Sequence, residues 1–265
     1  MGAENKKLKV HLIIQRGDNE SNTQLKEYIV EVEQGSVVLD AVHAVQAEKS
    51  PDLAVRWNCK AGKCGSCSAE VNGQPKLMCM TKLSAYDLKK PILIKPLQTF
   101  PLIKDLVTDV SWNYDVNRSI KPFQMAKVDR PLMLQQDVNR VQEFRKCIEC
   151  FLCQNVCHVL RTHNKYEEYA GPRFFVRLAN LEMHPLDTED RIKDIKDIHG
   201  IGYCNITKCC TEVCPEQIKI TDNAIIPLKE RVADQYYDPI KMIWRKIFKR
   251  RKTLPLGLKI AKSEE

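Results

Sequence analysis

The twelve cysteines are the residues of this sequence best suited to chemistry, and they fall into three groups. The groups are Cys59, Cys64, Cys67 and Cys79; Cys147, Cys150, Cys153 and Cys157; and Cys204, Cys209, Cys210 and Cys214. Disulfide frameworks are typical of short secreted chains, and the N-terminal stretch MGAENKKLKV lacks the apolar segment of a secretory signal. The cysteines are therefore predicted to hold metal centres rather than disulfides.

The first group has the spacing that holds a 2Fe-2S cluster in plant-type ferredoxins. Three cysteines crowd one loop and the fourth follows a hairpin: Cys59, Cys64, Cys67 and Cys79. Gly62 and Gly65 supply the backbone freedom that a tight loop around a cluster needs. Zinc is the alternative, but a zinc ion usually takes two well-separated cysteine pairs. The spacing favours iron.

The second group is the bacterial ferredoxin run Cys147-x2-Cys150-x2-Cys153-x3-Cys157. In such a run the first three cysteines bind one cubane and the fourth reaches a second cluster, so a second run is expected. Reading from Cys204 in the same frame gives Cys204-x2-Thr207-x2-Cys210-x3-Cys214-Pro215. The third group is therefore the same run with threonine in place of its second cysteine.

Exchange of the fourth cysteines assigns the ligands of both clusters. The predicted 4Fe-4S ligands are Cys147, Cys150, Cys153 and Cys214, and the predicted ligands of the second cluster are Cys157, Cys204 and Cys210. A site with three thiolates and Thr207 at its fourth corner does not readily hold a fourth iron, which predicts a 3Fe-4S cluster. Cys209 is out of frame and is expected to be a non-ligand thiol, buried as a small hydrophobe.

Two predicted regions carry these groups. Strand patterns cover residues 8–15, 26–32, 53–57, 68–71 and 92–94, with a turn at Asn72-Gly73. Apolar residues at helical spacing from Val38 to Val45 predict a crossing helix with Ser36 as its N-cap. After a link with three prolines, helical patterns cover 130–145, 172–183 and 228–235.

The predicted fold class is α+β. It combines an N-terminal plant-type ferredoxin (β-grasp) domain, residues 1–105, with an all-α, bacterial-ferredoxin-like domain, residues 106–238, and a basic tail, residues 239–265. Nine Lys/Arg and no acidic residue lie between Pro239 and Lys262, so the net charge of +8 leaves 8 − 9 = −1 for the residues outside 239–262, and no nucleic-acid partner is expected.

The tail also has an amphipathic pattern. Ile243, Trp244, Ile247 and Phe248 recur at helical spacing from Ile240, with basic residues between them. This pattern suits an anionic bilayer surface or a membrane anchor, the alternative being a solvated helix packed on its own domain. No run approaches the roughly 18 apolar residues of a membrane span.

The three interlocking cysteine patterns resemble the iron-sulfur subunit of succinate dehydrogenase and fumarate reductase. The resemblance covers roughly residues 8–235 and rests on eleven cysteines in register, the loop CKAGKCGSC at 59–67, the linker PLIKDL at 101–106, and Cys214-Pro215. It implies a relay from covalently bound FAD of a flavoprotein subunit through 2Fe-2S, 4Fe-4S and 3Fe-4S clusters to quinone at a membrane anchor subunit, or the reverse with fumarate.

The resemblance further implies a peripheral place on the cytoplasmic face of the cell membrane, in respiration and the tricarboxylic acid cycle. The segments 149–157 and 182–187 look like the branch whose anchor carries b-type haem and whose quinone is menaquinone. Where the family commonly has proline after the fourth cysteine, this chain has His158, which either assists quinone reduction or hydrogen-bonds the backbone. The alternatives are a soluble, thiol-linked fumarate reductase subunit, a zinc-binding structural module and a free ferredoxin carrier.

Overall fold

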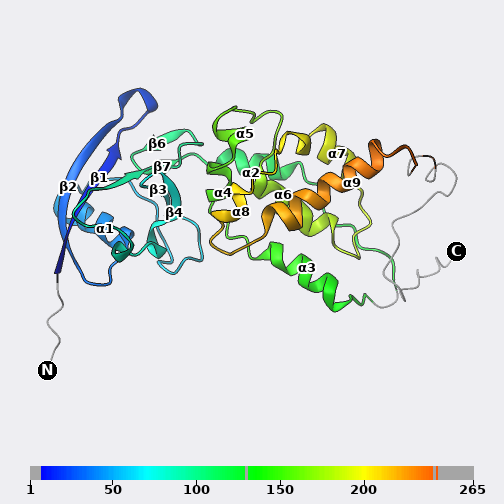
Figure 1. Ribbon diagram of the computed structural model, residues 1–265, viewed down its shortest axis with the longest axis horizontal. Coiled ribbons are helices and arrows are strands. Elements are labelled where there is room, and N and C mark those ends of the chain that lie inside the picture. The colour runs from blue at the N-terminus through cyan, green and yellow to red at the C-terminus, as the bar shows by residue number, and fades with distance from the viewer. Residues whose placement is uncertain (1–6, 129–130, 241–242, 244–265) are drawn as a thin grey trace. The chain divides into compact units, whose positions relative to one another are not determined.

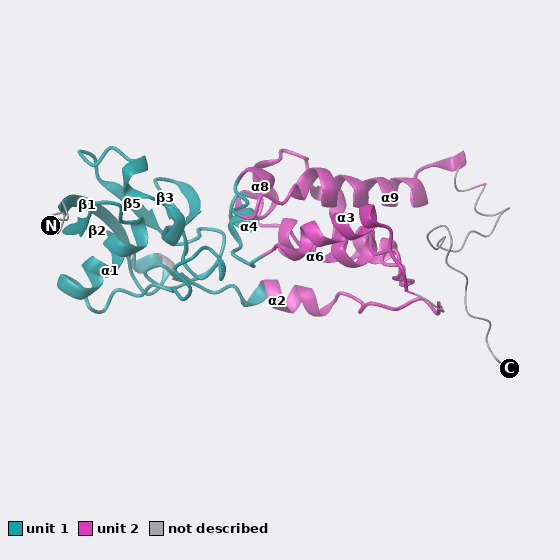
Figure 2. Cartoon of the chain, turned by 90° about the horizontal axis from the view of Figure 1, so that it is seen from below, with its two compact units in different colours: residues 1–112, 148–156, 213–215 teal, residues 113–147, 157–212, 216–265 magenta. Residues whose placement is uncertain are grey.

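The computed structural model describes residues 7–128, 131–240 and 243, which form two compact units (Figures 1 and 2). Within these ranges, unit 1 takes residues up to 112 together with 148–156 and 213–215, and unit 2 takes the others. Two short cysteine-bearing segments, 148–156 and 213–215, thus belong to unit 1 although they lie far along the chain from its other residues. Most of the basic tail, including Trp244, Ile247 and Phe248, lies outside the described residues.

Unit 1 is built on a mixed five-stranded sheet of order β2-β1-β5-β3-β4. The strands are β1 (Lys7–Arg16), β2 (Gln24–Glu33), β3 (Ser68–Val71), β4 (Gln74–Leu77) and β5 (Ile92–Lys95). β1 and β5 pair in parallel, and the other pairs are antiparallel. The helix α1 (Val38–Glu48) contacts β2 and buries its apolar face against the core (Figure 1). A small second sheet pairs β6 (Leu102–Lys104) with β7 (Val107–Thr108).

Single turns of 3-10 helix complete unit 1 as η1 (Glu20–Asn22), η2 (Met78–Met80) and η3 (Leu83–Ala85). The predicted hairpin turn is confirmed, because Asn72 and Gly73 have φ values of 50° and 77° between β3 and β4. Positive φ at both central residues is what the type I′ turn of a two-residue hairpin requires.

Two local predictions for unit 1 are wrong. Residues 53–57 form no strand; instead the backbone N–H of Ala54 donates to the carboxylate of Asp105 and its carbonyl accepts from Leu106. The backbone of this segment is thus paired with a loop rather than with a neighbouring strand. The N-cap of α1 is Val37, not Ser36, and the Asp40 carboxylate accepts the Val37 N–H at 3.0 Å.

Unit 2 is helical in its described part. Its elements are α3 (Gln135–Arg145), α5 (His158–Arg161), α6 (Pro172–Glu182), α7 (Ile192–Asp197), η4 (Ile201–Tyr203), α8 (Cys209–Glu212), the π-helix η5 (Ile220–Ile225) and α9 (Ile226–Tyr236). The helix α2 (Ser111–Arg118) begins in unit 1, and the short α4 (Leu152–Asn155) belongs to unit 1 (Figure 2). α6 contacts both α3 and η5, and most of its side chains, Phe174 and Phe175 among them, are buried, which makes it the central helix of this unit.

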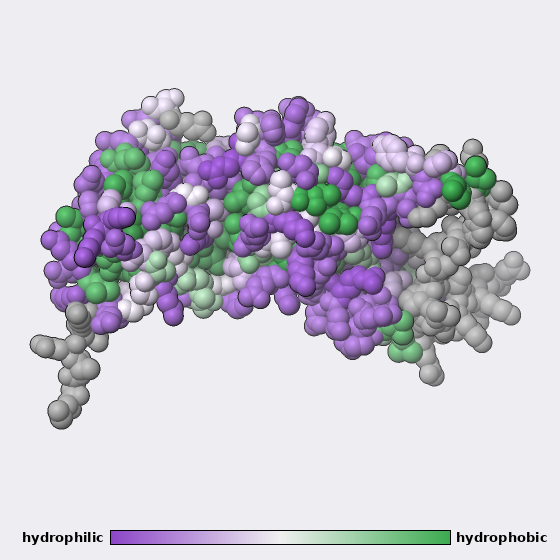
Figure 3. Space-filling view, viewed as in Figure 1, coloured by the Kyte–Doolittle hydropathy of each residue, from purple (hydrophilic) through white to green (hydrophobic). Residues whose placement is uncertain are grey.

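The described surface is mixed in character. Hydrophobic side chains are interspersed with hydrophilic ones on the face drawn in Figure 3. Within residues 7–128, 131–240 and 243, no helix combines the length and hydropathy that crossing a bilayer demands.

Three histidines are expected to make stability depend on pH. Burial lowers the pKa of His43, His184 and His199. Because the unfolded value is near 6.5, the unfolded chain binds more protons once the pH falls below it. The contribution of these groups to stability is therefore present above pH ~6.5 and is lost as the pH falls toward the lower folded values.

The prediction is checked by urea unfolding of the cluster-loaded protein at several pH values between about 7.5 and 5.5, the range in which histidine titrates. The urea concentration at the unfolding midpoint should fall on acidification. The fall should be smaller in His199→Gln, because that variant lacks a buried titratable ring, which packs against Phe174 with ring centroids 4.4 Å apart. His163→Gln is the control, because His163 is exposed. An equal acid response in both variants would contradict the argument.

Candidate functional site

The first cysteine group lies on the loop between residues 59 and 67, directly before β3, and on η2. Backbone N–H groups of Ala61 and Lys63 donate to Cys59 Sγ at 3.4 and 3.3 Å, and the N–H of Cys79 donates to Cys67 Sγ at 3.4 Å. Hydrogen bonds to sulfur stabilise thiolate ligands and tune the potential of a bound cluster. The loop thus presents thiols already surrounded by N–H donors.

The electrostatics of these thiols shows that they lie near one another. Burial acts to raise the pKa of Cys64, but hydrogen bonds from Cys59 and Ser66 outweigh it and lower the pKa to about 6. Burial raises the pKa of Cys67 to about 12, and the neighbouring thiols of Cys79 and Cys64 add to the rise. Four thiols that influence one another in this way fit a single cluster, so the residues present suit a 2Fe-2S centre.

Gly65 brings this loop against the second cysteine run. Its φ is 69°, and a Cβ built there would lie 2.7 Å from Cys150 Cα and 2.9 Å from the carbonyl oxygen of Ile148. The Ser68 hydroxyl lies 2.8 Å from the carbonyl oxygens of both Gly65 and Cys150. Only glycine allows this close approach of two cluster-binding segments.

Further contacts build the segment 148–156 into unit 1. The buried Asn155 donates from Nδ2 to Glu70 Oε1 at 2.7 Å, and its Oδ1 accepts from the N–H of Thr99 at 3.1 Å. The rings of Phe151 and Phe100 meet edge to face, with centroids 5.9 Å apart. Residues of β3 and of the linker that follows β5 thereby hold this segment.

The 4Fe-4S set predicted from the sequence falls mainly in unit 1. Cys150 and Cys153 are buried there, and Cys214 belongs to the returning segment 213–215. Val213, next to Cys214, packs against the hydrophobic core that also receives Ile148. Cys147 directly precedes Ile148 in the chain and belongs to unit 2.

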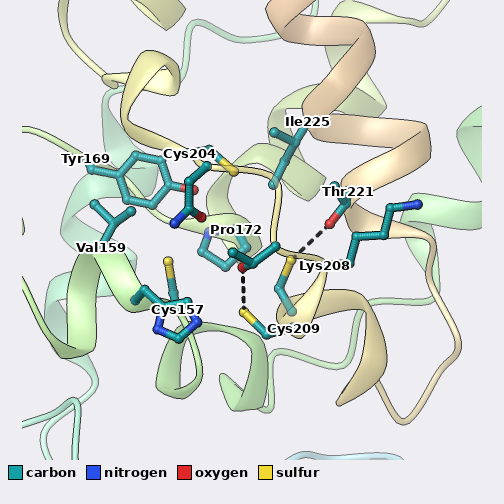
Figure 4. A pocket seen from close by; sticks show the side chains of 13 residues that line it. Cys157, Val159, Tyr169, Pro172, Cys204, Lys208, Cys209, Thr221 and Ile225 are labelled. Carbon is teal, nitrogen blue, oxygen red and sulfur yellow. Dashed lines mark hydrogen bonds between the residues drawn. The ribbon is translucent and has the colours of Figure 1, made fainter.

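The remaining predicted ligands line one cavity of unit 2 (Figure 4). Cys157, Cys204 and Cys210 share this cavity with Cys209 and Thr207. Burial raises the pKa of Cys210 to about 11, although a hydrogen bond with the Thr221 hydroxyl, 3.4 Å away, opposes the rise. Burial also raises the pKa of Cys157, opposed by the N–H groups of Leu160 and Val159. Three converging, mostly buried thiols with nearby donors fit a three-thiolate cluster.

The backbone repeats itself between the second and third groups. Glu149 and Phe151 have φ values of 56° and 59°, and Ile206 and Lys208, which stand at the same places in the frame, have 60° and 63°. Left-handed backbone at non-glycine residues is uncommon, above all for a β-branched isoleucine. Thr207 therefore occupies, between two left-handed residues, the position that Cys150 occupies in the first run.

Three residues of the cavity region were not predicted from the sequence. Tyr169 is 1% exposed, and burial, then the nearby thiols of Cys157, Cys204 and Cys210, raise its pKa well above the ordinary value. Thr221 comes from the π-helix η5, and Lys229 Nζ donates to the carbonyl of Cys204 at 2.6 Å. No signal in the sequence marks them, because each lies far along the chain from the cysteine that it contacts.

His158 begins α5, is exposed, and lines the same cavity beside Cys157. His163 is exposed two residues beyond the end of α5. Among the described residues, His158 is the histidine that lines this cavity.

Comparisons with known proteins agree with these centres. Residues 7–115 match the model of a 2Fe-2S iron-sulfur cluster binding domain, and residues 143–218 match that of a 4Fe-4S dicluster domain. A chain of the Mycobacterium smegmatis Sdh1 complex in the apo form is 59% identical, with a TM-score of 0.85, over 89% of this chain and 100% of that one. The chain belongs to the iron-sulfur subunit family of succinate dehydrogenase and fumarate reductase.

Other relatives of this chain are more distant. The fumarate reductase iron-sulfur subunit of Mycobacterium tuberculosis is 28% identical over 77% of this chain and 84% of its own length. Uncharacterized iron-sulfur proteins of Methanococcus maripaludis and Methanocaldococcus jannaschii are 32% and 30% identical over 78% and 77% of this chain, which spans only 42% and 41% of their lengths. The predicted family, its role as an oxidoreductase subunit and its 2Fe-2S and 4Fe-4S domains are confirmed.

Proposed function

We propose that this chain is the electron-transfer subunit of a succinate:quinone oxidoreductase. It would carry electrons between FAD of a flavoprotein subunit and membrane quinone, in either the succinate-oxidising or the fumarate-reducing direction. The observation that carries the proposal is the 59% identity with a chain of the Sdh1 complex over that chain's full length. When bound, the iron-sulfur clusters supply one-electron transfer.

The proposed ligand sets are those of the exchanged ferredoxin runs. Cys59, Cys64, Cys67 and Cys79 hold the 2Fe-2S cluster; Cys147, Cys150, Cys153 and Cys214 the 4Fe-4S cluster; and Cys157, Cys204 and Cys210 the 3Fe-4S cluster. The division of the chain supports this exchange, since the Cys214 segment joins Cys150 and Cys153 in unit 1, while Cys157 lines the cavity with Cys204 and Cys210. We also propose that the sheet domain is of the β-grasp class and the helical domain of the all-α bacterial-ferredoxin class.

The surroundings of the cysteines contribute to this proposed function through burial and through hydrogen bonds to sulfur. Burial at Cys67, Cys79, Cys157 and Cys210 excludes water from the centres. N–H donors around Cys59, Cys67 and Cys157 stabilise negative charge on sulfur. Both are means by which a protein sets the reduction potential of a cluster.

The membrane end of the relay is proposed to lie at the unit 2 cavity. His158 is exposed beside Cys157, where an imidazole could hold a proton for quinone, which we suggest is menaquinone. The proposed partners are the flavoprotein and a b-haem anchor subunit, with the basic tail facing the anchor or the anionic cytoplasmic surface. The thiol-linked alternative is not favoured, because the identity with the Sdh1 chain far exceeds the 28–32% identities of the other relatives named above.

The decisive measurement is low-temperature EPR of the purified protein with iron and sulfide counts. A 3Fe-4S signal in the air-oxidised sample, joined on reduction by 2Fe-2S and 4Fe-4S signals, is the expected result. Two 4Fe-4S clusters without an oxidised three-iron signal would contradict the proposed ligand sets. Bound zinc without inorganic sulfide would instead support the zinc-binding structural module.

Thr207→Cys is expected to restore the complete ferredoxin run. The variant should lose the oxidised three-iron signal and gain one iron per chain, since a thiolate then stands at the position that Cys150 holds in the first run. Thr207→Ser is the matched control and should keep the three-iron signal. If Thr207→Cys kept the oxidised three-iron signal and gained no iron, position 207 would not correspond to the second cysteine of the ferredoxin run.

A further inference from the structure

The unit 2 cavity holds one more thiol than its proposed ligand set uses. Cys209 is partly exposed at the start of α8, and its Sγ lies 3.3 Å from the Thr207 hydroxyl oxygen. Figure 4 shows its sulfur on the inner side of the ring of lining residues, where the sulfurs of Cys157 and Cys204 also lie. The extra thiol therefore faces the centre.

A purely structural role for Cys209 would predict a different position. In the repeated frame Cys209 corresponds to Leu152, which is 2% exposed and packs in the hydrophobic core of unit 1. A cysteine that served only as a small hydrophobe would be expected in the equivalent buried place. Cys209 instead lies beside Thr207, the residue at the corner where the run lacks a cysteine.

Cys209 is also within reach of the proposed ligands. Cys209 lines the same cavity as Cys157 and Cys210, the two buried thiols of the proposed set. A thiolate there would therefore sit among the existing cluster thiolates rather than on a remote surface. This proximity, the contact with Thr207 and the inward orientation point to the same role.

We propose that Cys209 is a facultative fourth ligand, which lets the three-iron centre take up a fourth iron under reducing conditions. The inference rests on the proposed 3Fe-4S assignment. One electron from a reductant such as dithionite brings the oxidised three-iron core to its neutral state. Cys209 then bonds the incoming ferrous ion through sulfur and releases its proton to solvent, so that the neutral core plus Fe2+ gives a doubly positive four-iron core with no further electron.

The test uses the full, cluster-loaded protein, reduced with dithionite and incubated with isotopically labelled ferrous iron. After gel filtration and mild reoxidation, the wild-type protein should have gained one iron per chain and lost its oxidised three-iron EPR signal. Mössbauer spectra should place the label in a four-iron cluster. The 2Fe-2S and 4Fe-4S signals of the same samples report that the protein is intact.

Cys209→Ala should keep the three-iron signal as isolated and show iron uptake reduced at least about tenfold, the change that roughly 1.4 kcal/mol of lost binding free energy gives. Thr207→Val removes only the neighbouring hydroxyl and should keep the uptake. Uptake unchanged in Cys209→Ala, or lost in Thr207→Val alone, would overturn the proposal.

Two further outcomes separate this inference from the proposed function. If the isolated wild-type protein shows the three-iron signal but takes up no iron, only the proposed role of Cys209 is wrong. If the isolated protein lacks the three-iron signal, the proposed ligand sets are wrong as well. Cys209→Ser guards against a variant that misfolds. Loss of the three-iron signal in both Cys209 variants would make the residue essential to the resting centre and would also overturn a facultative role.

Discussion

Gly65→Ala is expected to lower the free energy of unfolding by about 2–5 kcal/mol and to impair assembly of the 4Fe-4S centre. Gly65 has φ 69°, which costs an L-residue about 1–2 kcal/mol. In addition, the new Cβ would lie 2.7 Å from Cys150 Cα, so one of two backbones must move. Because Cys150 is a proposed 4Fe-4S ligand, this displacement reaches the centre itself.

Gly73→Ala separates the two costs. Gly73 has a similar φ of 77°, but a Cβ there would meet no described heavy atom within 4 Å. It should therefore lose only the conformational part, about 1–2 kcal/mol, and keep every cluster signal. Urea unfolding and EPR of both variants are the measurements. Equal losses of stability would mean that the approach of Gly65 to Cys150 contributes nothing.

Asp105→Ala is expected to cost about 3–5 kcal/mol, because it leaves the buried guanidinium of Arg16 without its inner partner. Asp105 is 1% exposed, and its Oδ1 accepts from Arg16 Nε and from the N–H of Gly17, each at 2.9 Å. Its Oδ2 accepts from the N–H of Ala54 at 2.8 Å. One carboxylate thus connects β1, the segment that precedes the 2Fe-2S loop, and the linker that follows the sheet.

Asp52→Ala is the matched control, because Asp52 pairs with the same arginine. Its Oδ2 lies 2.6 Å from Arg16 Nη2, but its side chain is 67% exposed, and such a pair contributes about 0–1 kcal/mol. Unfolding by urea should therefore separate the two variants by at least about 2 kcal/mol. If Asp105→Ala and Asp52→Ala lowered the free energy of unfolding equally, burial would not decide how much each carboxylate stabilises this network.

The arrangement of unit 1 gives these two predictions a functional meaning. The loop with the 2Fe-2S cysteines and the segment with two of the proposed 4Fe-4S cysteines contact each other through Gly65 and Ser68 within one compact unit. Short, packed contacts between cluster-binding segments suit transfer of electrons from one centre to the next. Damage at Gly65 or Asp105 should therefore appear in the EPR signals as well as in stability.

The sequence alone predicted the family, the 2Fe-2S and 4Fe-4S domains, and the main strands and helices, whereas the 3Fe-4S cluster and the frame that places Thr207 at a cysteine position stay predictions. These features are local: ligand spacing is limited by the short loops that must wrap a cluster, and strands and helices have their own periodicities. The hairpin at Asn72-Gly73 and the helix α6 follow for the same reason.

The tertiary structure alone decided which distant segments meet. Residues 53–57 look like a strand, yet a carboxylate about fifty residues away pairs their backbone. The packing of Tyr169 and Thr221 beside the cysteines of the unit 2 cavity and the approach of Gly65 to Cys150 depend on segments far apart in the chain. The same is true of Cys209, whose sulfur faces the cavity rather than the core because the fold, not the spacing, determines where a side chain points.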